Sequence, residues 1–282
     1  LEALWRGVYG LVSNLETDET LQLGILDVSK QALQADLTAH GQDPLDSAFG
    51  REMARQSDEG VDGAAWSLMV GCYAFDASAH DLGFLCAIGA VAGGIGVPFL
   101  AAASPRLAGF PDLLAESGPS EWVEPALAQW RALRAGEQGH WIGLASPRVL
   151  LRLPYGDAGE ACDAFLFEEM PGEPEHGGLL WGNPALACAQ AVGLAFQNAG
   201  WSPDLVAAGD LGDLPALTYT LDGERALYPC AERYLGERAG QSVYDGGCIP
   251  LLSHKNRNAV RIGPLRSVHD DGQLLPIRSV VR

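Results

Sequence analysis

The stretch from His140 to Glu169 decides how this chain folds. It begins His-Trp-Ile-Gly-Leu-Ala-Ser-Pro-Arg-Val-Leu-Leu-Arg-Leu-Pro-Tyr-Gly at residues 140–156 and ends Ala-Phe-Leu-Phe-Glu-Glu at residues 164–169. Trp141 to Ala145 is a short apolar run that stops at Ser-Pro, which predicts a buried strand. A buried strand needs apolar layers on both faces, and the rest of the chain has to supply them.

Two arginines interrupt the apolar residues that follow this predicted strand. Arg148 and Arg152 lie among Val149, Leu150, Leu151 and Leu153, and an arginine is hard to bury without partners. One interpretation pairs them at a packed junction with carboxylates, for which Glu168 and Glu169 are the candidates. The other places both on a solvated face, with their stems covering apolar surface. On the residues alone the second interpretation is slightly favoured.

The composition indicates a folded protein that is strongly acidic. The 282 residues (29.8 kDa) are 48% apolar and 19% charged, which is ordinary for a globular chain and unlike a disordered one. This length predicts one large domain over 1–282, or two small ones. The net charge of −18 argues against DNA or RNA as the main partner and leaves a basic protein partner open.

The cysteines and the N-terminus predict a cytoplasmic protein. None of the cysteines forms a close C-x-x-C pair, and a chain this long does not need disulfides. We therefore expect reduced, mostly buried thiols. The first 15 residues show no signal peptide, and because the chain starts with Leu1 we expect a preceding segment. The cysteines are Cys72, Cys86, Cys162, Cys188, Cys230 and Cys248.

Periodicity predicts alternating helices and strands in the first hundred residues. Apolar residues recur at helical spacing from Leu1 to Leu15, and Ser29 is a good cap for a second helix. The predicted order of strand, helix, helix, strand, helix, strand is typical of α/β layering. The expected elements are a helix over 1–15, a strand over 20–28, helices over 30–39 and 49–56, and a strand over 66–75.

The uncharged stretch from Leu82 to Pro105 is long enough to cross a bilayer. Its many glycines lower both its apolar content and its helix propensity. We therefore predict no membrane span, but a helix capped by Ser78 or Asp81 that ends near Gly93, followed by a buried strand over 97–103. The glycines end a helix and precede a strand, which is the wrong order for a dinucleotide-binding loop.

The second half of the chain predicts further helices, a flexible loop and two hairpins. The loop over 171–178 is the best internal boundary or insertion point. An apolar helix over 179–199, with a possible start at Asn183-Pro184, ends at Gly200. Asp-Gly signals predict hairpins. The other expected elements are surface helices over 110–116 and 121–135, a strand over 248–252, and hairpins formed by 215–220 with 225–228 and by 258–268 with 273–281.

The predicted fold is therefore α/β, with mixed α+β still open: a sheet layered with helices, and two hairpins in the C-terminal third. No internal repeat is apparent.

A search for chemistry finds no catalytic, cofactor-binding or metal-binding residues. Ser146 lacks the second glycine of a nucleophile elbow, and a proline stands where the helix must begin. Asp210 and Asp213 are better explained by a turn than by a calcium loop. The adjacent Glu168 and Glu169 would point to opposite faces of a strand.

The histidines offer no better site. They are scattered without metal-ligand spacing, and His176 is interpreted as a solvated loop residue. The segment 254–256 (His-Lys-Asn) is interpreted as a loop at a strand end. No set of nucleophile, base and oxyanion donors is recognisable, so the sequence gives no case for an enzyme. The histidines are His40, His80, His140, His176, His254 and His269.

A series of short motifs in a fixed order resembles the large subunit of the type VI secretion contractile sheath, the TssC/VipB family. The resemblance covers about residues 1–262, and its specificity comes from many motifs in register. They are Leu-Trp-Arg-Gly-Val (4–8), Glu-Thr-Asp-Glu (16–19), Leu-Asp-Val-Ser-Lys (26–30), Gly-Cys-Tyr-Ala-Phe-Asp (71–76), Val-Pro-Phe-Leu (97–100), Pro-Arg-Val-Leu-Leu-Arg-Leu-Pro-Tyr-Gly (147–156), Phe-Leu-Phe-Glu-Glu (165–169), Trp-Gly-Asn-Pro-Ala (181–185), Gly-Asp-Leu-Pro-Ala (212–216) and Ile-Pro-Leu-Leu (249–252).

This resemblance implies a cytoplasmic structural protein with no catalytic residues. It implies pairing with a small sheath subunit, wrapping of an inner-tube protein, contraction that drives the tube and its effectors outward, and later disassembly by an ATPase. Two alternatives stay open: a sheath-like regulatory or baseplate-associated module that does not contract, and an α/β enzyme with an unrecognised site near Gly93–Pro98 or Arg148.

Overall fold

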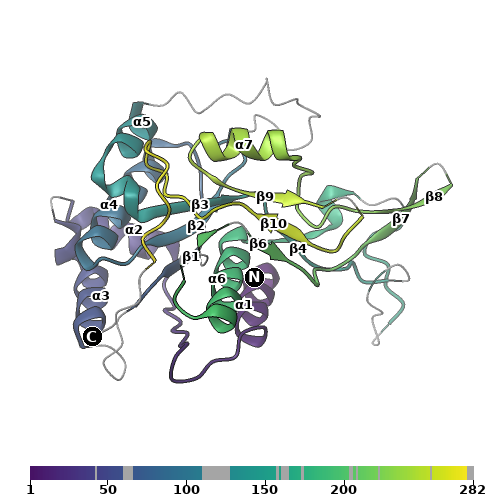
Figure 1. Ribbon diagram of the computed structural model, residues 1–282, viewed down its shortest axis with the longest axis horizontal. Coiled ribbons are helices and arrows are strands. Elements are labelled where there is room, and N and C mark those ends of the chain that lie inside the picture. The colour runs from purple at the N-terminus through teal and green to yellow at the C-terminus, as the bar shows by residue number, and fades with distance from the viewer. Residues whose placement is uncertain are drawn as a thin grey trace.

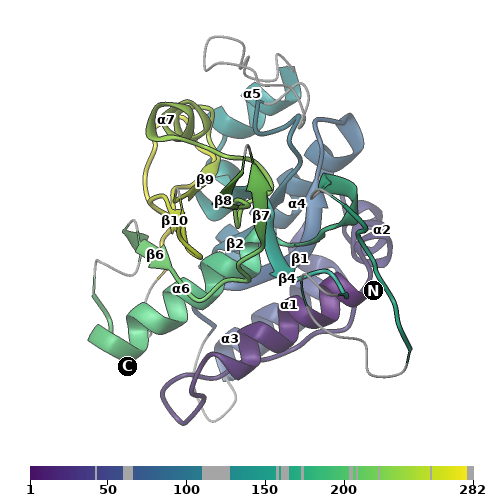
Figure 2. The same cartoon turned by 90° about the vertical axis from the view of Figure 1, so that its right-hand side faces the viewer.

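The computed structural model describes residues 1–41, 43–59, 66–109, 128–156, 159, 165–172, 175–202, 206–207, 209–221, 223–254 and 256–277. A six-stranded sheet forms the middle layer of this part of the chain, and helices cover both of its faces (Figures 1 and 2). The helices are α1 (Glu2–Ser13), α2 (Lys30–Ala39), α3 (Ala48–Glu59), α4 (Ala79–Ile95), α5 (Ala128–Ala135), α6 (Pro184–Ala199) and α7 (Glu237–Asp245), with short 3-10 helices η1 (Pro44–Asp46), η3 (Glu137–Trp141) and η4 (His176–Gly178).

The main sheet is mixed and has the strand order β1-β2-β3-β9-β10-β6. The first four strands run parallel, whereas β10 is antiparallel to both β9 and β6. Two small sheets, β4 with β5 and β7 with β8, are both antiparallel. The strands are β1 (Met69–Phe75), β2 (Phe99–Ala103), β3 (Ile142–Ser146), β4 (Val149–Arg152), β5 (Leu180–Gly182), β6 (Gly209–Leu211), β7 (Thr218–Leu221), β8 (Glu224–Leu227), β9 (Ile249–Ser253) and β10 (Val260–Ile262).

Side-chain alternation along the central strands builds a core on each face of the sheet. On one face, Phe99 and Ala101 of β2 and Leu144 of β3 pack with α2, α4 and α5. On the other face, Leu100 and Ala145 pack with α6. The apolar composition of β2 and β3 fits strands that are covered on both faces, since every one of their residues is buried.

Capping side chains fix the helix ends that the sequence predicts. Ser29 accepts a hydrogen bond from Ala32 N at the start of α2, and Ser78 accepts one from Asp81 N at the start of α4. Asn183 caps α6 by accepting from Ala185 N, so the predicted start at Asn183-Pro184 is the correct one. Gly96, at φ +72°, ends α4 in the left-handed conformation that favours glycine.

The α/β prediction is confirmed, together with most of the predicted elements. The uncharged stretch forms α4 and β2, and within the described residues no helix is both long and apolar enough to cross a bilayer. The hairpin at Gly223 forms as β7–β8 and extends away from the layered body (Figure 1). The predicted helix over 110–116 and the first part of the one over 121–135 lie outside the described residues; α5 is the remainder of the latter.

The predicted strand over 20–28 is wrong. Residues 22–29 have no regular secondary structure. Their apolar residues Leu23, Ile25 and Leu26 nevertheless have the spacing that predicts a strand. Ile25 is 74% exposed, so the described chain leaves its side chain largely uncovered. A strand needs a hydrogen-bonded neighbour as well as a favourable pattern, and here the described chain supplies none.

The second hairpin forms only in part. A turn at Gly272 and a single antiparallel bridge between Arg266 and Leu274 are present. The residues at 260–262 instead form β10 and join the large sheet between β9 and β6. Pairing with two neighbours in the large sheet satisfies more backbone groups than an isolated hairpin does. Residues 278–282 lie outside the described part.

Candidate functional site

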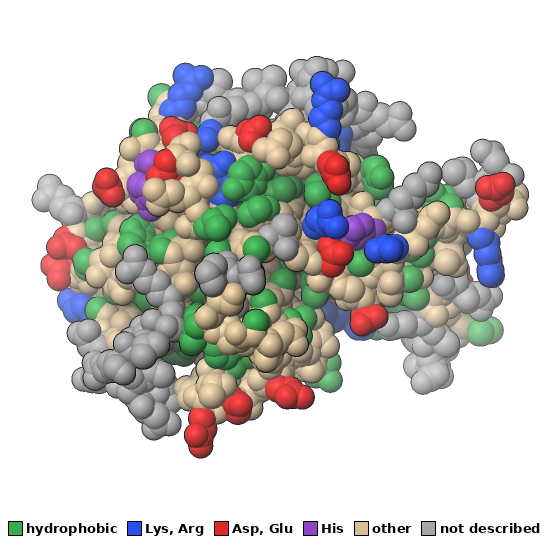
Figure 3. Space-filling view, viewed as in Figure 1, with side chains coloured by type: hydrophobic (Ala, Val, Ile, Leu, Met, Phe, Trp, Pro, Cys, Tyr) green, Lys and Arg blue, Asp and Glu red, His purple; other side chains and the backbone are tan. Residues whose placement is uncertain are grey.

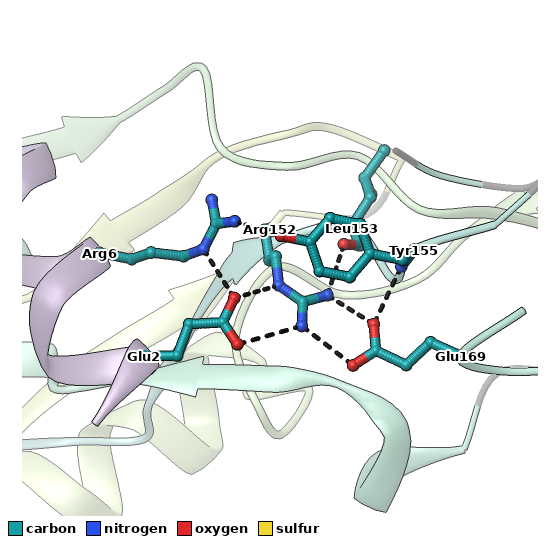
Figure 4. A network of polar contacts seen from close by, with 6 residues as sticks. All are labelled: Glu2, Arg6, Arg152, Leu153, Tyr155 and Glu169. Carbon is teal, nitrogen blue, oxygen red and sulfur yellow. Dashed lines mark hydrogen bonds and ion pairs between the residues drawn. The ribbon is translucent and has the colours of Figure 1, made fainter. Parts of the chain in front are cut away.

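Arg152, at the end of β4, is the centre of a polar junction that joins three distant segments (Figure 4). Its side chain is only 4% exposed. Its Nε donates to Glu2 Oε1 at 2.7 Å, and its two terminal nitrogens donate to Glu169 at 2.6 and 2.9 Å. The Leu153 carbonyl, at 3.0 Å, and Glu2 Oε2, at 3.4 Å, accept the remaining bonds. All five N–H groups of the guanidinium therefore have acceptors.

The neighbours of Arg152 extend and stiffen this junction. Arg6 donates to Glu2 at 2.9 Å and to the Tyr155 hydroxyl at 2.8 Å. The centroid of the Tyr155 ring lies 4.3 Å from the Arg152 guanidinium carbon. Glu169 N–H donates to the Tyr155 carbonyl, and Tyr155 N–H donates to the Glu169 carboxylate. The junction therefore fixes α1, the end of β4 and the segment at 165–169 against one another.

The charges of the junction favour its ionised state. Hydrogen bonds from Arg152 hold the pKa values of Glu2 and Glu169 below the ordinary value of 4.5. The same bonds, that to Glu169 foremost, raise the pKa of Arg152. Two partly exposed carboxylates face the buried Arg152 and the partly exposed Arg6, so the four formal charges sum to zero. This balance is what makes the burial of an arginine tolerable.

Arg148, just before the same strand, forms a second junction. It contacts both carboxylate oxygens of Glu232, and His176 Nε2 lies 2.8 Å from Glu232 Oε1. The Glu232 side chain is 1% exposed, whereas that of Arg148 is 45% exposed. Burial alone would raise the pKa of Glu232, but the hydrogen bonds and charge of Arg148, together with His176, leave it lowered.

The structure gives a different answer for each of the two arginines. The paired interpretation is confirmed for Arg152 with Glu169, and the solvated-face interpretation is wrong for that residue. Arg148 is half exposed, and its partner is Glu232, 84 residues away, which no local pattern indicates. Glu168 lies against Gly156, where an added Cβ would overlap the carboxylate. His176 is not a solvated loop histidine, because it contacts the buried Glu232.

Apolar side chains are exposed on the two segments that the Arg152 junction joins, α1 and the residues before Glu169. On α1, Trp5 is 66% and Tyr9 72% exposed, whereas Gly7 on the opposite face is buried against α6. Phe165, Leu166 and Phe167 lie just before Glu169 and are also exposed. We call these two stretches, with Leu4 and Val12, the apolar surface. Exposed apolar patches and aromatic side chains are features of surfaces that bind other proteins.

The other residues that the sequence singles out are structural in this arrangement. Ser146 is buried at the end of β3. Asp210 lies on β6, not in a turn, and contacts His254 and Arg261, whereas Asp213 has a positive φ of 57° that fits a turn. The segment beginning at His254 follows β9, as predicted for a strand-end loop.

Two shallow hollows lie on the surface of the described residues, and both are open to solvent. One lies between the start of α7 and β9, lined by Tyr234, Leu252 and His254 among others. The other lies beside the exposed segment at 21–25 and is mostly apolar. Figure 3 shows acidic side chains spread along the margins of the visible face, and histidines beside charged groups in two places.

The sequence does not indicate one cluster of titratable side chains that the structure contains. His140 and His269 stack on each other with Asp271 between their ring nitrogens, although 131 residues separate His140 from Asp271. Only the tertiary structure brings them together, because linear spacing carries no signal over such a separation.

Comparison with known proteins identifies relatives of the chain. A family profile described as "VipB: EvpB/VC_A0108, tail sheath N-terminal domain" matches residues 1–269. A curated relative, the "Type VI secretion system sheath protein TssC1" of Pseudomonas aeruginosa, is 32% identical over 269 residues. That alignment covers 91% of this chain and 53% of the relative, so the chain spans about half the length of the curated relative it matches.

Proposed function

The chain belongs to the VipB tail sheath family, and from that premise we propose that it is a structural component of a type VI secretion contractile sheath. The family consists of sheath structural proteins and not of enzymes. The observation that carries the proposal is the match of residues 1–269 to the sheath N-terminal domain. The functional work is then done by contacts with neighbouring subunits and not in a catalytic pocket.

The proposed partners are a small sheath subunit and an inner-tube protein, in the cytoplasm. The sheath wraps the tube and drives it outward with its effectors by contraction, and an ATPase takes the contracted sheath apart. The net charge of −18 supports a contact with the tube that rests on charge complementarity. Such a contact gives register and steering with little adhesion, so the tube is released when the sheath moves.

The apolar surface is the proposed contact with the small sheath subunit. Burying aromatic side chains such as Trp5 and Phe165 supplies most of the binding free energy in a typical protein interface. The Arg152 junction links the two stretches of this surface, because Glu2 belongs to the same helix as Trp5 and Glu169 follows Phe167 closely. The surface is therefore held in place before the partner arrives, which lowers the entropic cost of binding.

Coexpression tests this proposal. The chain, and the same chain with the flanking segments of its relative added, would be produced together with a small sheath subunit and an inner-tube protein. We expect a complex in affinity pull-down and sheath-like tubes in negative-stain microscopy for the extended version. The absence of any complex with both versions contradicts the proposal, and small closed oligomers without tubes would favour the non-contractile regulatory module.

A matched pair of variants distinguishes binding through the apolar surface from nonspecific adhesion of exposed aromatic side chains. Trp5→Ser removes an aromatic side chain from the proposed interface. Trp201→Ser removes one that is 46% exposed and packs on Phe196 at the end of α6. We expect the first variant to weaken the complex at least tenfold and the second to leave it unchanged. Equal effects of the two substitutions would exclude the apolar surface as the contact.

The domain arrangement belongs to the same proposal. We propose that residues 1–282 act as one sheath-like domain, with the loop at 171–178 as its insertion point. Limited proteolysis is the test: cleavage at this loop should leave two fragments that stay associated, because β4 before it and β5 after it pair in one sheet.

A further inference from the structure

His140, His269 and Asp271 together have the composition of a transition-metal site. The ring centroids of His140 and His269 are 3.6 Å apart, with an angle of 21° between the planes. Asp271 Oδ2 lies 3.0 Å from His140 Nε2, and Asp271 Oδ1 lies 3.0 Å from His269 Nδ1. One ligand atom from each residue can be chosen so that all three lie within 4.8 Å of one another.

His140 and His269 each aim one ring nitrogen at the Asp271 carboxylate. Asp271 N–H lies 3.3 Å from His269 Nδ1, in position to donate to the lone pair of that nitrogen. The lone pairs of His269 Nδ1 and His140 Nε2 are the ones that a metal ion would use, with the carboxylate as the third ligand. A single divalent cation could therefore contact both nitrogens and the carboxylate at once.

We propose that His140, His269 and Asp271 bind a divalent transition metal of the zinc class. Two imidazole nitrogens and one carboxylate favour Zn²⁺, Co²⁺ or Ni²⁺ over Mg²⁺ or Ca²⁺, which prefer oxygen ligands alone. With metal–ligand bonds of about 2.0–2.1 Å, tetrahedral ligand atoms stand about 3.4 Å apart. The two nitrogen–oxygen separations are 3.0 Å each and all three ligand atoms lie within 4.8 Å of one another, so the side chains would have to adjust modestly to reach this geometry.

The ligands sit on backbone that other contacts hold in place. Val268 N donates to the Ile142 carbonyl at 2.8 Å, and Asp270 N donates to the Arg134 carbonyl at 3.0 Å. Gln273 N donates to Asp271 Oδ1 at 3.0 Å and orients that carboxylate. Metal sites depend on such outer contacts to aim their ligands.

The surrounding charges tolerate a cation. His140 Nδ1 is buried, makes no hydrogen bond to the described residues, and lies 3.9 Å from a carboxylate oxygen of Glu137, which can orient the ring from behind. The nearest guanidinium groups are already engaged. Arg134 is 2.9 Å from Asp270, and Arg266 donates to the His269 and Tyr244 carbonyls.

The proposed metal would link two segments that are far apart in the sequence. His140 belongs to η3, which packs on α4 and leads into β3, whereas His269 and Asp271 belong to the turn before residues 273–277. Three protein ligands leave one tetrahedral position open for water. The metal would therefore hold this turn to the body of the chain, and its binding should stabilise the fold.

Isothermal titration of the chelator-stripped chain with ZnCl₂ tests the proposal directly. We expect one saturable site in the unaltered chain and a loss of affinity of at least tenfold in His140→Ala and Asp271→Asn. His80→Ala is the matched control, since its side chain is 74% exposed and outside the cluster; it should bind Zn²⁺ as the unaltered chain does. Co²⁺ should give the visible absorption of a tetrahedral N/O site in the same variants that bind Zn²⁺.

Thermal melting with and without Zn²⁺ provides the second readout. The metal should raise the melting temperature of the unaltered chain and of His80→Ala only, and melting in chelator will show that each variant is folded. Absence of saturable binding in the unaltered chain overturns the proposal and leaves a proton-bridged cluster. Binding that persists in a His140→Ala/Asp271→Asn double variant also overturns it, because the metal then lies elsewhere.

Discussion

At the scale of single residues, Arg152 shows how a charge can be buried in an apolar strand. Its five N–H groups all have acceptors, and two carboxylates balance its charge and that of Arg6. Burial of such a group gives little net stability compared with an apolar core, but removal of a carboxylate partner is costly because Arg152 then stays buried without compensation. The junction therefore specifies geometry more than it adds stability.

We predict that Arg152→Ala destabilises the chain by about 1.5–3 kcal/mol, because the hydrogen bonds from the buried guanidinium to Glu2 and Glu169 are lost while the partly exposed carboxylates can be hydrated. Chemical denaturation monitored by circular dichroism measures the change. Arg55→Ala is the matched control, because Arg55 pairs with Glu52 on an exposed helix face and its loss should leave the unfolding midpoint almost unchanged. A loss below about 1 kcal/mol for Arg152→Ala would contradict the role given to the junction.

The lowered pKa values of Glu169 and Glu232 predict how the free energy of unfolding depends on pH. The folded state holds the pKa of each carboxyl below 4.5, so each contributes stability that is fully present above that value. The contribution is lost as pH falls from about 5 through the lowered pKa, because the unfolded chain then binds protons more readily. Urea midpoints measured between about pH 7 and 3 should fall, and Glu232→Gln should show a smaller fall from a lower starting value.

At the scale of elements, the crossing of α1 and α6 depends on a glycine. Gly7 is buried in α1, and a Cβ added there would lie 2.7 Å from a methyl carbon of Leu186 on α6. The two helices lie side by side in Figure 2. This close approach fixes the position of α1, and with it the direction in which Trp5 and Tyr9 face solvent.

We predict that Gly7→Leu destabilises the chain by about 1–3 kcal/mol by forcing α1 away from α6. Gly10→Ala, one turn later in the same helix, is the matched control: nothing lies within 4 Å of its added Cβ, so higher helix propensity should stabilise by up to about 1 kcal/mol. Melting temperatures of the two variants should therefore move in opposite directions, and a shift in the same direction would refute the packing account.

At the scale of the whole molecule, two properties have to be considered together: the net negative charge and the apolar core on each face of the sheet. The sheet has an apolar core on each face, whereas 36 acidic residues against 18 basic ones leave the chain at −18. Self-repulsion of this size opposes compaction but keeps subunits apart until a complementary partner binds. The proposed sheath role calls for both properties, since a sheath subunit must be rigid within itself and adhere selectively to its neighbours.

Salt should therefore stabilise the isolated chain. Raising NaCl from about 10 to 150 mM shortens the Debye length from about 30 to 8 Å and screens the surface repulsion more than the buried pairs. We expect the melting temperature to rise by a few degrees over this range, measured by scanning calorimetry. A fall would mean that surface ion pairs, and not net repulsion, dominate the electrostatic free energy.

Local chemistry determined the elements themselves. The Ser29 and Ser78 caps, the Asn183-Pro184 start of α6, the buried strands β2 and β3 and the hairpin at Gly223 all follow from residues close together in the chain. Each is governed by short-range sterics and hydrogen bonds, which a sequence displays directly. The ordered sheath motifs, each only a few residues long, likewise carry the family resemblance in the sequence itself.

Only the tertiary structure decided which distant residues meet. The partners of Arg148, the stacking of His140 on His269 and the placement of β10 in the large sheet depend on contacts across 84 residues or more, or on competition for strand edges. The segment at 20–28 has the pattern of a strand but no neighbour in the described chain, so it forms none. Pattern sets what a segment can become, and the surrounding chain sets whether its hydrogen bonds and apolar face are satisfied.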